Sequence, residues 1–325
     1  MTPQFDRRAF LAGGAALALG ASGAKAQSFP SGPVKIVTSV GAGSSPDVCA
    51  RVLADYLTRL WGQQVIVLNQ PGGAGAVAIK AVAPAAPDGH TLYMSLASNF
   101  IALPELQTNF PVDVLRDFVP IGYVGDHPMV IAAGRELGVS TLPELIALAK
   151  KRKGELNFAC GNRGSILHLT GEWLRTATGI EVTLVHYPSA SQAITDILGG
   201  RVHAMIDAVA SMRGAIAGGQ LKALAVATKT RLPNFPDLPT AADTIQGFEA
   251  VGWLALMASP GTPVPLARKI SDDLRGVLAQ PEFQKRYEDL GTYIRLTTPE
   301  QLVAFIREQQ RIWGPVIAET AKKIK

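Results

Sequence analysis

Two short loops rich in glycine and serine each precede a predicted helix. The first covers residues 39–47 (Ser39-Val40-Gly41-Ala42-Gly43-Ser44-Ser45-Pro46-Asp47), and the second covers residues 161–165 (Gly161-Asn162-Arg163-Gly164-Ser165). Ser44 or Ser45 can cap the first helix, and Ser165 can cap the second. Free backbone N–H groups at a helix N-terminus attract an anion without any metal or formal charge. Together the two loops favour a site that binds a carboxylate.

The residue types that enzymes use do not form a catalytic pattern in this sequence. Gly41-Ala42-Gly43 is followed by Ser-Ser-Pro, so the third glycine of the dinucleotide fingerprint G-x-G-x-x-G is missing. No nucleophile elbow G-x-S-x-G occurs, and helix capping explains Ser165 more simply than nucleophilic attack. The five histidines lack the spacing of metal ligands, and we expect His168 to make a structural hydrogen bond. We therefore expect no enzyme, no metal and no cofactor, and keep a hydrolase as a remote alternative.

Short β-branched segments alternate with longer helical segments along the chain. Strands are expected at 34–38, 65–68, 91–96, near 129–131, and at 156–160, 181–187, 203–207, 223–228 and 249–258. Helices are expected at 46–61, 76–83, 142–152, 166–178, 189–198, 211–217, 240–246, 264–279, 282–290 and 299–320. Repeated strand–helix units predict an α/β fold with mostly parallel sheets flanked by helices.

The length of the chain favours two lobes rather than one. Chains of about 300 residues usually divide into two domains. The last helices are too few to form a domain of their own, so we expect them to pack back on the first block. The predicted lobes are residues 27–125 plus 252–325 and residues 126–251, joined by a two-segment hinge. A cleft between hinged lobes is a usual place for a ligand.

The N-terminus has the features of an export signal. Arg7 and Arg8 precede an apolar stretch over residues 9–21, and Ala24-Lys25-Ala26 follows. A charged region, a short apolar region and an A-x-A motif in this order indicate cleavage between Ala26 and Gln27. The apolar stretch is too short to span a bilayer, and the paired arginines resemble a twin-arginine signal. We therefore predict a periplasmic protein.

The charge of the chain does not indicate a nucleic-acid-binding protein. The formal net charge of +5 falls to +3 without the first 26 residues, which hold three cations and one acid. The one basic run, residues 150–153, precedes Gly154 and ends an amphipathic helical pattern. Cations in a last helical turn before glycine are favoured by the helix dipole and the C-cap. No basic face with interleaved aromatic residues is present.

From about Phe29 to its C-terminus, the chain resembles the Bug family of extracytoplasmic solute receptors, the binding components of tripartite tricarboxylate transporters. The segments that carry the resemblance are Val34–Asp47 with Arg51, Gln70–Gly75, Ala86–Leu92, Gly161–Leu169, Tyr187, Asp196–Gly200, Asp207, Leu224–Val226, Pro236–Thr240, Trp253 and Ala258–Pro263. So many matches in order cover essentially the whole chain after the export signal.

The resemblance implies a two-lobed periplasmic-binding-protein-like fold (type II) that closes on a small organic acid and presents it to membrane permease subunits. It also implies that residues 38–47 and 161–168 hold one carboxylate through backbone amides, hydroxyls and bridging waters, and that residues 187–192 and Asp207 border the cleft. The expected ligand-binding residues are Ser39, Gly41, Ala42, Gly43, Ser44, Ser45, Asp47, Gly161, Asn162, Arg163, Gly164, Ser165, His168, Tyr187, Ser189, Ala190, Ser191 and Asp207. We expect a monomer, with a sensory co-receptor for a two-component system as the alternative function.

Three departures from the family pattern leave the choice of ligand open. Residues 40–43 read Val-Gly-Ala-Gly where the family commonly has P-P-G-G, and residues 186–189 read His-Tyr-Pro-Ser where it has P-Y-K-G. Arg163 stands where a small, apolar or uncharged residue is usual. Arg163 either pairs with a ligand carboxylate or faces solvent. Dicarboxylates, tricarboxylates, aromatic acids and amino acids all remain candidate ligands.

The two cysteines, Cys49 and Cys160, fall beside the two loops. Their count alone leaves one disulfide open in an oxidising compartment. A bond between opposite lobes would lock the hinge of a receptor that must open and close. We therefore expect free, partly buried thiols.

Overall fold

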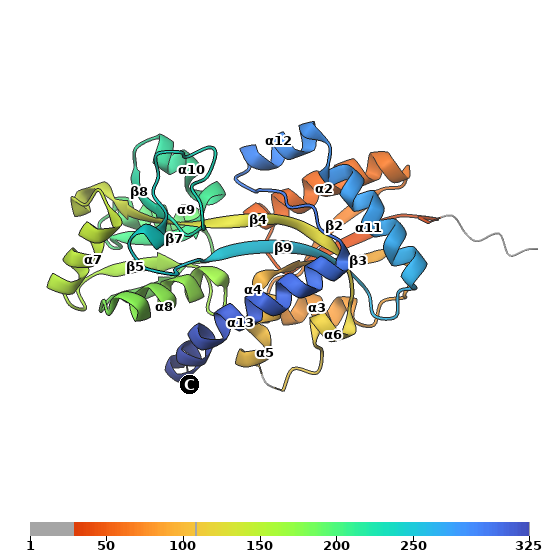
Figure 1. Ribbon diagram of the computed structural model, residues 1–325, viewed down its shortest axis with the longest axis horizontal. Helices are drawn as coiled ribbons and strands as arrows, with labels where there is room; N and C mark the ends of the chain where they lie inside the picture. The colour runs from red at the N-terminus through yellow and green to blue at the C-terminus, as the bar shows by residue number, and fades with distance from the viewer. Residues whose placement is uncertain (1–28, 108, 325) are drawn as a thin grey trace, which may run out of the picture.

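A computed structural model describes residues 29–107 and 109–324 (Figure 1), so the predicted export signal over residues 1–26 lies outside the described residues. The strands are β1 (Val34–Thr38), β2 (Val65–Asn69), β3 (Thr91–Leu96), β4 (Val119–Gly134), β5 (Asn157–Cys160), β6 (Thr183–His186), β7 (Ala204–Ala208), β8 (Leu221–Val226) and β9 (Val251–Ala258). The helices are α2 (Ser45–Trp61), α3 (Ala76–Val82), α4 (Ala97–Ile101), α5 (Leu103–Leu106), α6 (Val114–Asp117), α7 (Leu142–Lys151), α8 (Ile166–Thr178), α9 (Ala190–Leu198), α10 (Val209–Ala217), α11 (Val264–Leu278), α12 (Pro281–Asp289) and α13 (Pro299–Ile324). None of the helices within these ranges is long and apolar enough to cross a membrane.

The strands and helices predicted from a strong local pattern are present in the structure. The elements that were missed or predicted wrongly are all short. Three helices of four or five residues, α4, α5 and α6, were missed because so few residues show no helical period. The helix predicted at 240–246 is wrong, since only the 3₁₀ turn Ala241–Asp243 forms there. Thr240 and Asp243 make a capping box. The sequence therefore indicated correctly that a helical segment begins at Thr240, but this segment is only one short turn.

The nine strands of the described chain form one mixed sheet in the order β2-β1-β3-β9-β4-β7-β5-β6, with β8 also paired to β4. Within each half the strand–helix units give parallel pairs, β1 with β2 and β3, and β5 with β6 and β7. β9 runs antiparallel to β3 and β4, and β7 and β8 run antiparallel to β4. The α/β class and the flanking helices agree with the prediction, while the returning strands make the sheet mixed.

β4 is a 16-residue strand that belongs to both halves of the sheet (Figure 1). Its first part pairs with β9, from Val119 opposite Ala258 to Pro128 opposite Val251, and its second part pairs with β7 and β8. Only the second part was predicted, because prolines and glycines interrupt the first part. A Cβ on Gly125 would lie 2.6 Å from Thr292 Cγ2, so this strand needs glycine to pack closely.

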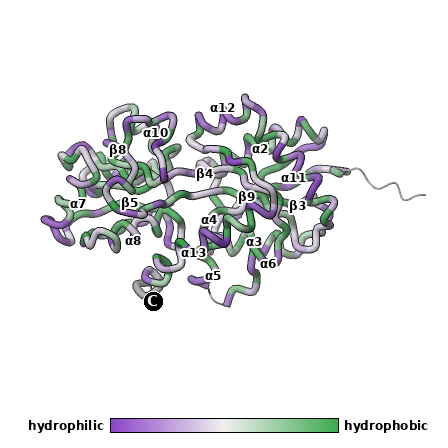
Figure 2. The backbone as a smooth tube through the Cα atoms, in the orientation of Figure 1, coloured by the Kyte–Doolittle hydropathy of each residue, from purple (hydrophilic) through white to green (hydrophobic). Residues whose placement is uncertain are grey.

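We call residues 29–125 and 252–324 the first lobe and residues 126–251 the second lobe; these boundaries remain predictions. The last helix, α13, contacts both lobes. Gln310 Nε2 donates to Phe100 O of the first lobe at 3.0 Å, and the Trp313 ring lies 5.1 Å from that of Trp173 on α8. By contrast α12 is largely hydrophilic (Figure 2) and buries only Phe283 and Tyr287. The lobes are thus connected by β4, by β9 with the segment before it, and by the packing of α13.

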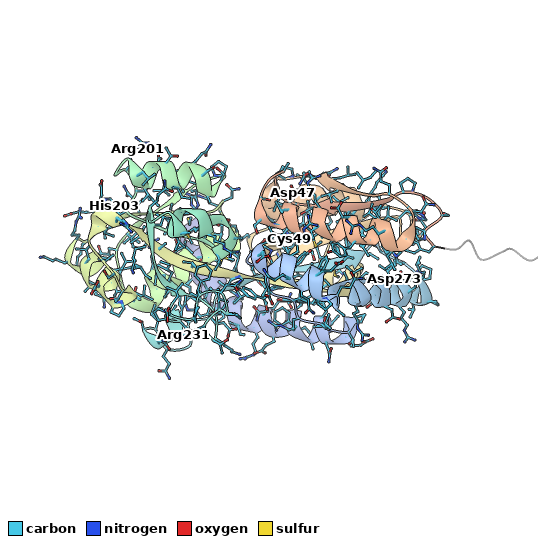
Figure 3. All side chains as sticks on the ribbon, turned by 90° about the horizontal axis from the view of Figure 1, so that it is seen from above. Asp47, Cys49, Arg201, His203, Arg231 and Asp273 are labelled. Atoms are coloured by element: carbon cyan, nitrogen blue, oxygen red, sulfur yellow. The ribbon has the colours of Figure 1, made fainter. Side chains whose placement is uncertain are left out.

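Both cysteines are free, as predicted, but they are more deeply buried than expected. Cys49 is 0% exposed and Cys160 is 3% exposed. Burial raises the pKa of Cys49 to about 11. In Figure 3, Cys49 and Asp47 lie at the end of the first lobe that is nearer the second lobe. Cys49 Sγ lies 3.3 Å from Thr292 Oγ1, and Cys160 Sγ lies 3.4 Å from His186 Nδ1.

Candidate functional site

A cavity of about 760 Å³ lies between the two lobes. The first lobe lines it with residues 40–46 and 48 at α2, 96–98 at α4, 252–254 of β9 and 289–290 at the end of α12. The second lobe lines it with residues 127 and 129 of β4, 161–162 and 165–167 at α8, 187–191 at α9, and 207, 208, 210 and 211 at α10. Four helices of nine or more residues, α2, α8, α9 and α10, therefore begin at this cavity.

The first loop is held by a buried carboxylate. Gly43 adopts a left-handed backbone (φ 80°), and its N–H donates to Asp47 Oδ2 at 2.8 Å. Asp47 is 1% exposed and also accepts from Asn69 Nδ2 at 2.7 Å and from Arg51 Nε at 3.0 Å. Burial would raise the pKa of Asp47, but the hydrogen bonds from Arg51, Asn69 and Gly43 outweigh burial and lower it. Asp47 is therefore ionised and fixes the shape of the loop.

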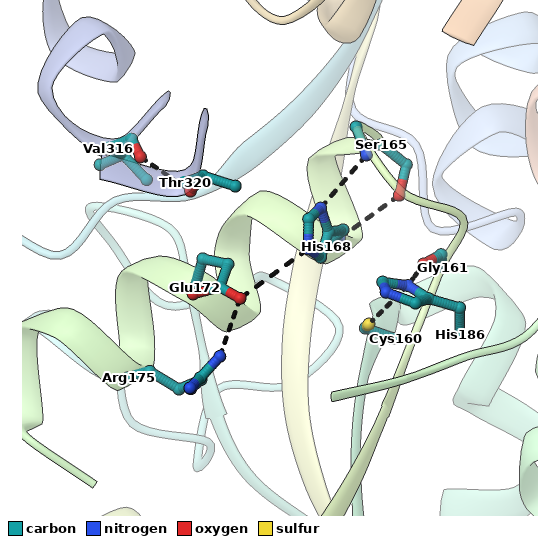
Figure 4. A network of polar contacts seen from close by, with 10 residues as sticks. Cys160, Gly161, Ser165, His168, Glu172, Arg175, His186, Val316 and Thr320 are labelled. Carbon is teal, nitrogen blue, oxygen red and sulfur yellow. Dashed lines mark hydrogen bonds and ion pairs between the residues drawn. The ribbon is translucent and has the colours of Figure 1, made fainter. Parts of the chain in front are cut away.

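The second loop is held by a buried histidine (Figure 4). Gly164 has a φ of 77°, and its N–H donates to His168 Nδ1 at 3.1 Å. The N–H of His168 donates to Ser165 Oγ at 3.3 Å, which is the capping bond of α8. Burial lowers the pKa of His168 to about 4, so the ring is neutral and its Nδ1 can accept. The expected structural role of this histidine agrees with these contacts.

The two loops share one backbone design. Ser44 has φ −72° and ψ 158°, and Ser165 has φ −72° and ψ 159°. In each loop a glycine with positive φ donates its N–H to the side chain four residues later. The left-handed conformation is costly for residues with a Cβ, so the loops need glycine at these positions. One such loop from each lobe brings a helix N-terminus to the same cavity.

The structure brings most of the predicted binding residues together around the cavity. The lining includes Gly41, Ala42, Gly43, Ser44, Ser45, Gly161, Asn162, Ser165, Tyr187, Ser189, Ala190, Ser191 and Asp207. Five predicted residues stand outside the lining, namely Ser39, Asp47, Arg163, Gly164 and His168. Of these, Gly164, Asp47 and His168 shape the loops through the contacts described above.

Replacing the exposed Arg163 by alanine is expected to change the dissociation constant of the organic acid expected in this cavity by less than about twofold. Arg163 is exposed and does not line the cavity, and an exposed charge is strongly screened by water and salt. Isothermal titration calorimetry of Arg163→Ala at low and physiological ionic strength measures this. A tenfold loss of affinity at physiological salt would instead show direct pairing with the ligand.

Several cavity residues gave no signal in the sequence. His127 lies on the part of β4 that was not predicted, and Ser45 Oγ is 3.4 Å from its Nδ1. Burial lowers the pKa of His127 to about 4, so this ring is neutral. Ala210 and Ser211 enter the lining because α10 begins at Val209, two residues before its predicted start. Local sequence patterns do not determine a helix start to within two residues, so the pattern gave no sign that Ala210 and Ser211 face the cavity.

The described residues that line the cavity offer helix dipoles and hydroxyl groups rather than cations. Within residues 29–107 and 109–324, no lysine or arginine lines the cavity. Its charged lining residues are Asp207 and Asp289, and burial raises the pKa of Asp207 to about 6. Tyr187 OH donates to Asp196 Oδ2 at 2.6 Å, which orients the phenol at the rim. Between residues 29 and 324, leaving out residue 108, no group of three or more His, Cys, Asp or Glu residues could hold a metal.

Comparison with known proteins gives consistent matches over about nine-tenths of the chain. Residues 49–321 match the model of the tripartite tricarboxylate transporter family receptor. Protein BugT of Bordetella pertussis is 34% identical over 302 residues, covering 92% of this chain and 93% of its own. The structure of R. palustris Rpa4515 with adipate has a TM-score of 0.84 and 26% identity, covering 90% of this chain and 98% of that one. MatC from Rhodopseudomonas palustris with bound malate has a TM-score of 0.80 and 27% identity, covering 89% and 100%.

Proposed function

Because the chain belongs to the tripartite tricarboxylate transporter receptor family, we propose that it captures a small organic acid in the interlobe cavity and delivers it to membrane permease subunits. The family consists of periplasmic solute-binding receptors of the Bug type, not of enzymes. The proposal includes export with cleavage between Ala26 and Gln27, and action as a monomer.

The observation that carries the proposal is the pair of matched loops at α2 and α8. Each loop presents a helix N-terminus to one cavity, and in the part of the chain that the structure describes no lysine or arginine side chain lines that cavity. A carboxylate between two such termini would be held by backbone N–H groups and by the hydroxyls of Ser45 and Ser165. Ligand contacts from both lobes also favour the closed state over the open state.

The comparison proteins support a small organic acid as the ligand class. The two Rhodopseudomonas structures contain adipate and malate, which are both short dicarboxylates. The cavity of about 760 Å³ is large enough for such a molecule together with bridging water. We therefore propose that the thirteen lining residues predicted from the sequence form the main contact set.

Purified protein lacking residues 1–26 is expected to bind one member of an organic-acid panel with a saturable one-to-one isotherm. The panel holds malate, adipate, citrate, benzoate and aspartate. A thermal-shift screen finds the binder, because a ligand specific for the folded state raises Tm, and calorimetry then measures Kd. Nuclear magnetic resonance of the same mixture should show no turnover of the acid.

Two results would contradict the proposal. One is the absence of any shift across the panel. The other is hydrolysis of a simple ester that is lost in Ser165→Ala, which would favour a hydrolase. Uptake of the bound acid that requires both this receptor and a pair of permease subunits would support delivery over sensing.

A further inference from the structure

The two lobes also touch each other at one side of the cavity, at residues 288–293, the segment from the end of α12 to Tyr293. We infer that this segment is an interlobe clasp, and that Arg213 and Asn234 of the second lobe determine the affinity of the receptor by holding it closed. The inference rests on the proposed function, since it concerns the closing of the same cavity on its ligand.

The clasp is anchored firmly in the first lobe. Tyr287, which is 0% exposed, donates its hydroxyl to Cys49 O of α2 at 2.8 Å. The N–H of Thr292 donates to Tyr287 O at 2.8 Å, and Thr292 is also 0% exposed. Tyr293 then exchanges backbone hydrogen bonds with Asp126 on β4, at 2.8 and 3.1 Å. The clasp is therefore anchored to the first lobe through Tyr287 and Thr292. At its other end Tyr293 joins it to Asp126, the first residue of the second lobe, and packs against the core of that lobe.

The second lobe contacts the clasp through polar side chains. Arg213 of α10 donates from its guanidinium to Asp289 O. Asn234 Nδ2, from the loop after β8, donates to Glu288 O at 3.2 Å. These carbonyls lie at the C-terminus of α12, which carries partial negative charge. Glu288 O also accepts from the N–H of Gly291 at 2.8 Å, so Asn234 adds a second donor to this oxygen. A cation from the opposite lobe is well placed to bind there.

Gly291 allows the backbones of the two lobes to approach closely. It is buried and left-handed, with a φ of 69°. A Cβ on Gly291 would lie 3.1 Å from the backbone N of Ala210 and 3.4 Å from Ala210 Cβ. Ala210, Asp289 and Leu290 also line the cavity. The clasp thus closes over one side of the cavity, and Arg213 and Asn234 are outside its lining.

Contacts that exist only between closed lobes contribute to ligand affinity. Opening the lobes for ligand release must break the hydrogen bonds of Arg213 and Asn234. When such a contact is lost, the closed state is less populated and Kd rises by the same factor. The change is expected mainly in the dissociation rate, because the release of the ligand requires opening.

The test compares Arg213→Ala, Asn234→Ala and the double variant with wild type, using malate or adipate, whichever wild type binds more tightly. Each single change is expected to raise Kd about two- to tenfold through faster dissociation, as for an exposed hydrogen bond. The Tm of the ligand-free protein should stay within the error of wild type. Arg213→Lys keeps the charge and should recover part of the affinity.

Gly291→Ala tests whether the close approach of the two lobes at Gly291 is needed for binding, and Gly138→Ala is its matched control. Both glycines are left-handed, at φ 69° and 70°, so alanine costs similar backbone strain at each. A Cβ on Gly138 meets nothing within 4 Å, so only Gly291→Ala should weaken binding, by tenfold or more. Unchanged dissociation rates in Arg213→Ala, Asn234→Ala and Gly291→Ala would overturn the clasp alone. A wild type that binds no member of the panel would contradict the proposed function and the clasp with it.

Discussion

Ser165→Asp is expected to weaken binding of the organic acid at least a hundredfold while the protein still folds. Ser165 lines the cavity and caps α8 by accepting from the N–H of His168. Aspartate caps a helix about as well as serine, so α8 should keep its start. The new carboxylate would face the carboxylate of the ligand. Two like charges about 4 Å apart repel by about 4 kcal/mol at an effective dielectric of about 20, which is roughly a thousandfold in Kd.

Thr141→Asp is the matched control for this substitution. Thr141 caps α7 in the same lobe by accepting from the N–H of Glu144 at 3.3 Å, and it does not line the cavity. Thr141→Asp adds the same negative charge at a helix N-terminus, and its Kd should stay within about twofold of the wild-type value. Calorimetry gives Kd, and thermal unfolding shows whether each variant stays folded. Ser165→Asp that binds as tightly as Thr141→Asp would place the ligand carboxylate elsewhere.

A disulfide between Ala210→Cys and Gly291→Cys is expected to trap the receptor closed, so that bound acid is retained for hours. The two Cβ positions lie 3.4 Å apart, close to the roughly 3.5–4.5 Å that disulfides span. Cys49 and Cys160 are buried and free, and burial raises the pKa of Cys160 to about 12. Since the thiolate is the reactive form, these native thiols should not compete for the new bond.

The measurement is the release of labelled malate or adipate from the oxidised double variant into ligand-free buffer. Oxidation in the presence of the acid should stop release, and reduction should restore it. The reduced double variant should release the acid faster than wild type, because its Cβ at position 291 meets Ala210 as it does in Gly291→Ala. Oxidation before the acid is added should stop uptake. The single variant Ala210→Cys, treated with the same oxidant, controls for the substitution itself. If the oxidised double variant exchanges ligand as fast as the reduced form, the contact between Ala210 and Gly291 does not control access to the cavity.

The sequence predicted the fold well wherever the signal was local. Each helix of nine or more residues was expected within a few residues of its place, because apolar period, capping serines and terminal glycines are all read from near neighbours. The two loops could be identified for the same reason. The positive φ of Gly43 and Gly164 and the helix that follows each loop are properties of a few consecutive residues.

The sequence alone could not separate residues that line the cavity from residues that support it. Asp47 and His168 are part of the same short segments as Ser45 and Ser165, yet their side chains turn back to the loop N–H groups. The local sequence pattern is equally consistent with side chains that line the cavity and with side chains that support the loops. The difference depends on which side of the loop faces the opposite lobe, and this is decided by the packing of β4 and β9 between the lobes.

What the sequence determined by itself is therefore the α/β class, the order of the main elements and the two loops that begin α2 and α8. Only the tertiary structure decided that His127, on an interrupted strand, lies 3.4 Å from Ser45, and that Gly291 meets Ala210. These pairs are separated by about eighty residues in the chain, so no local period or cap encodes them. They follow from the path of β4 between the lobes and from the anchoring of α12, which bring distant segments to one cavity.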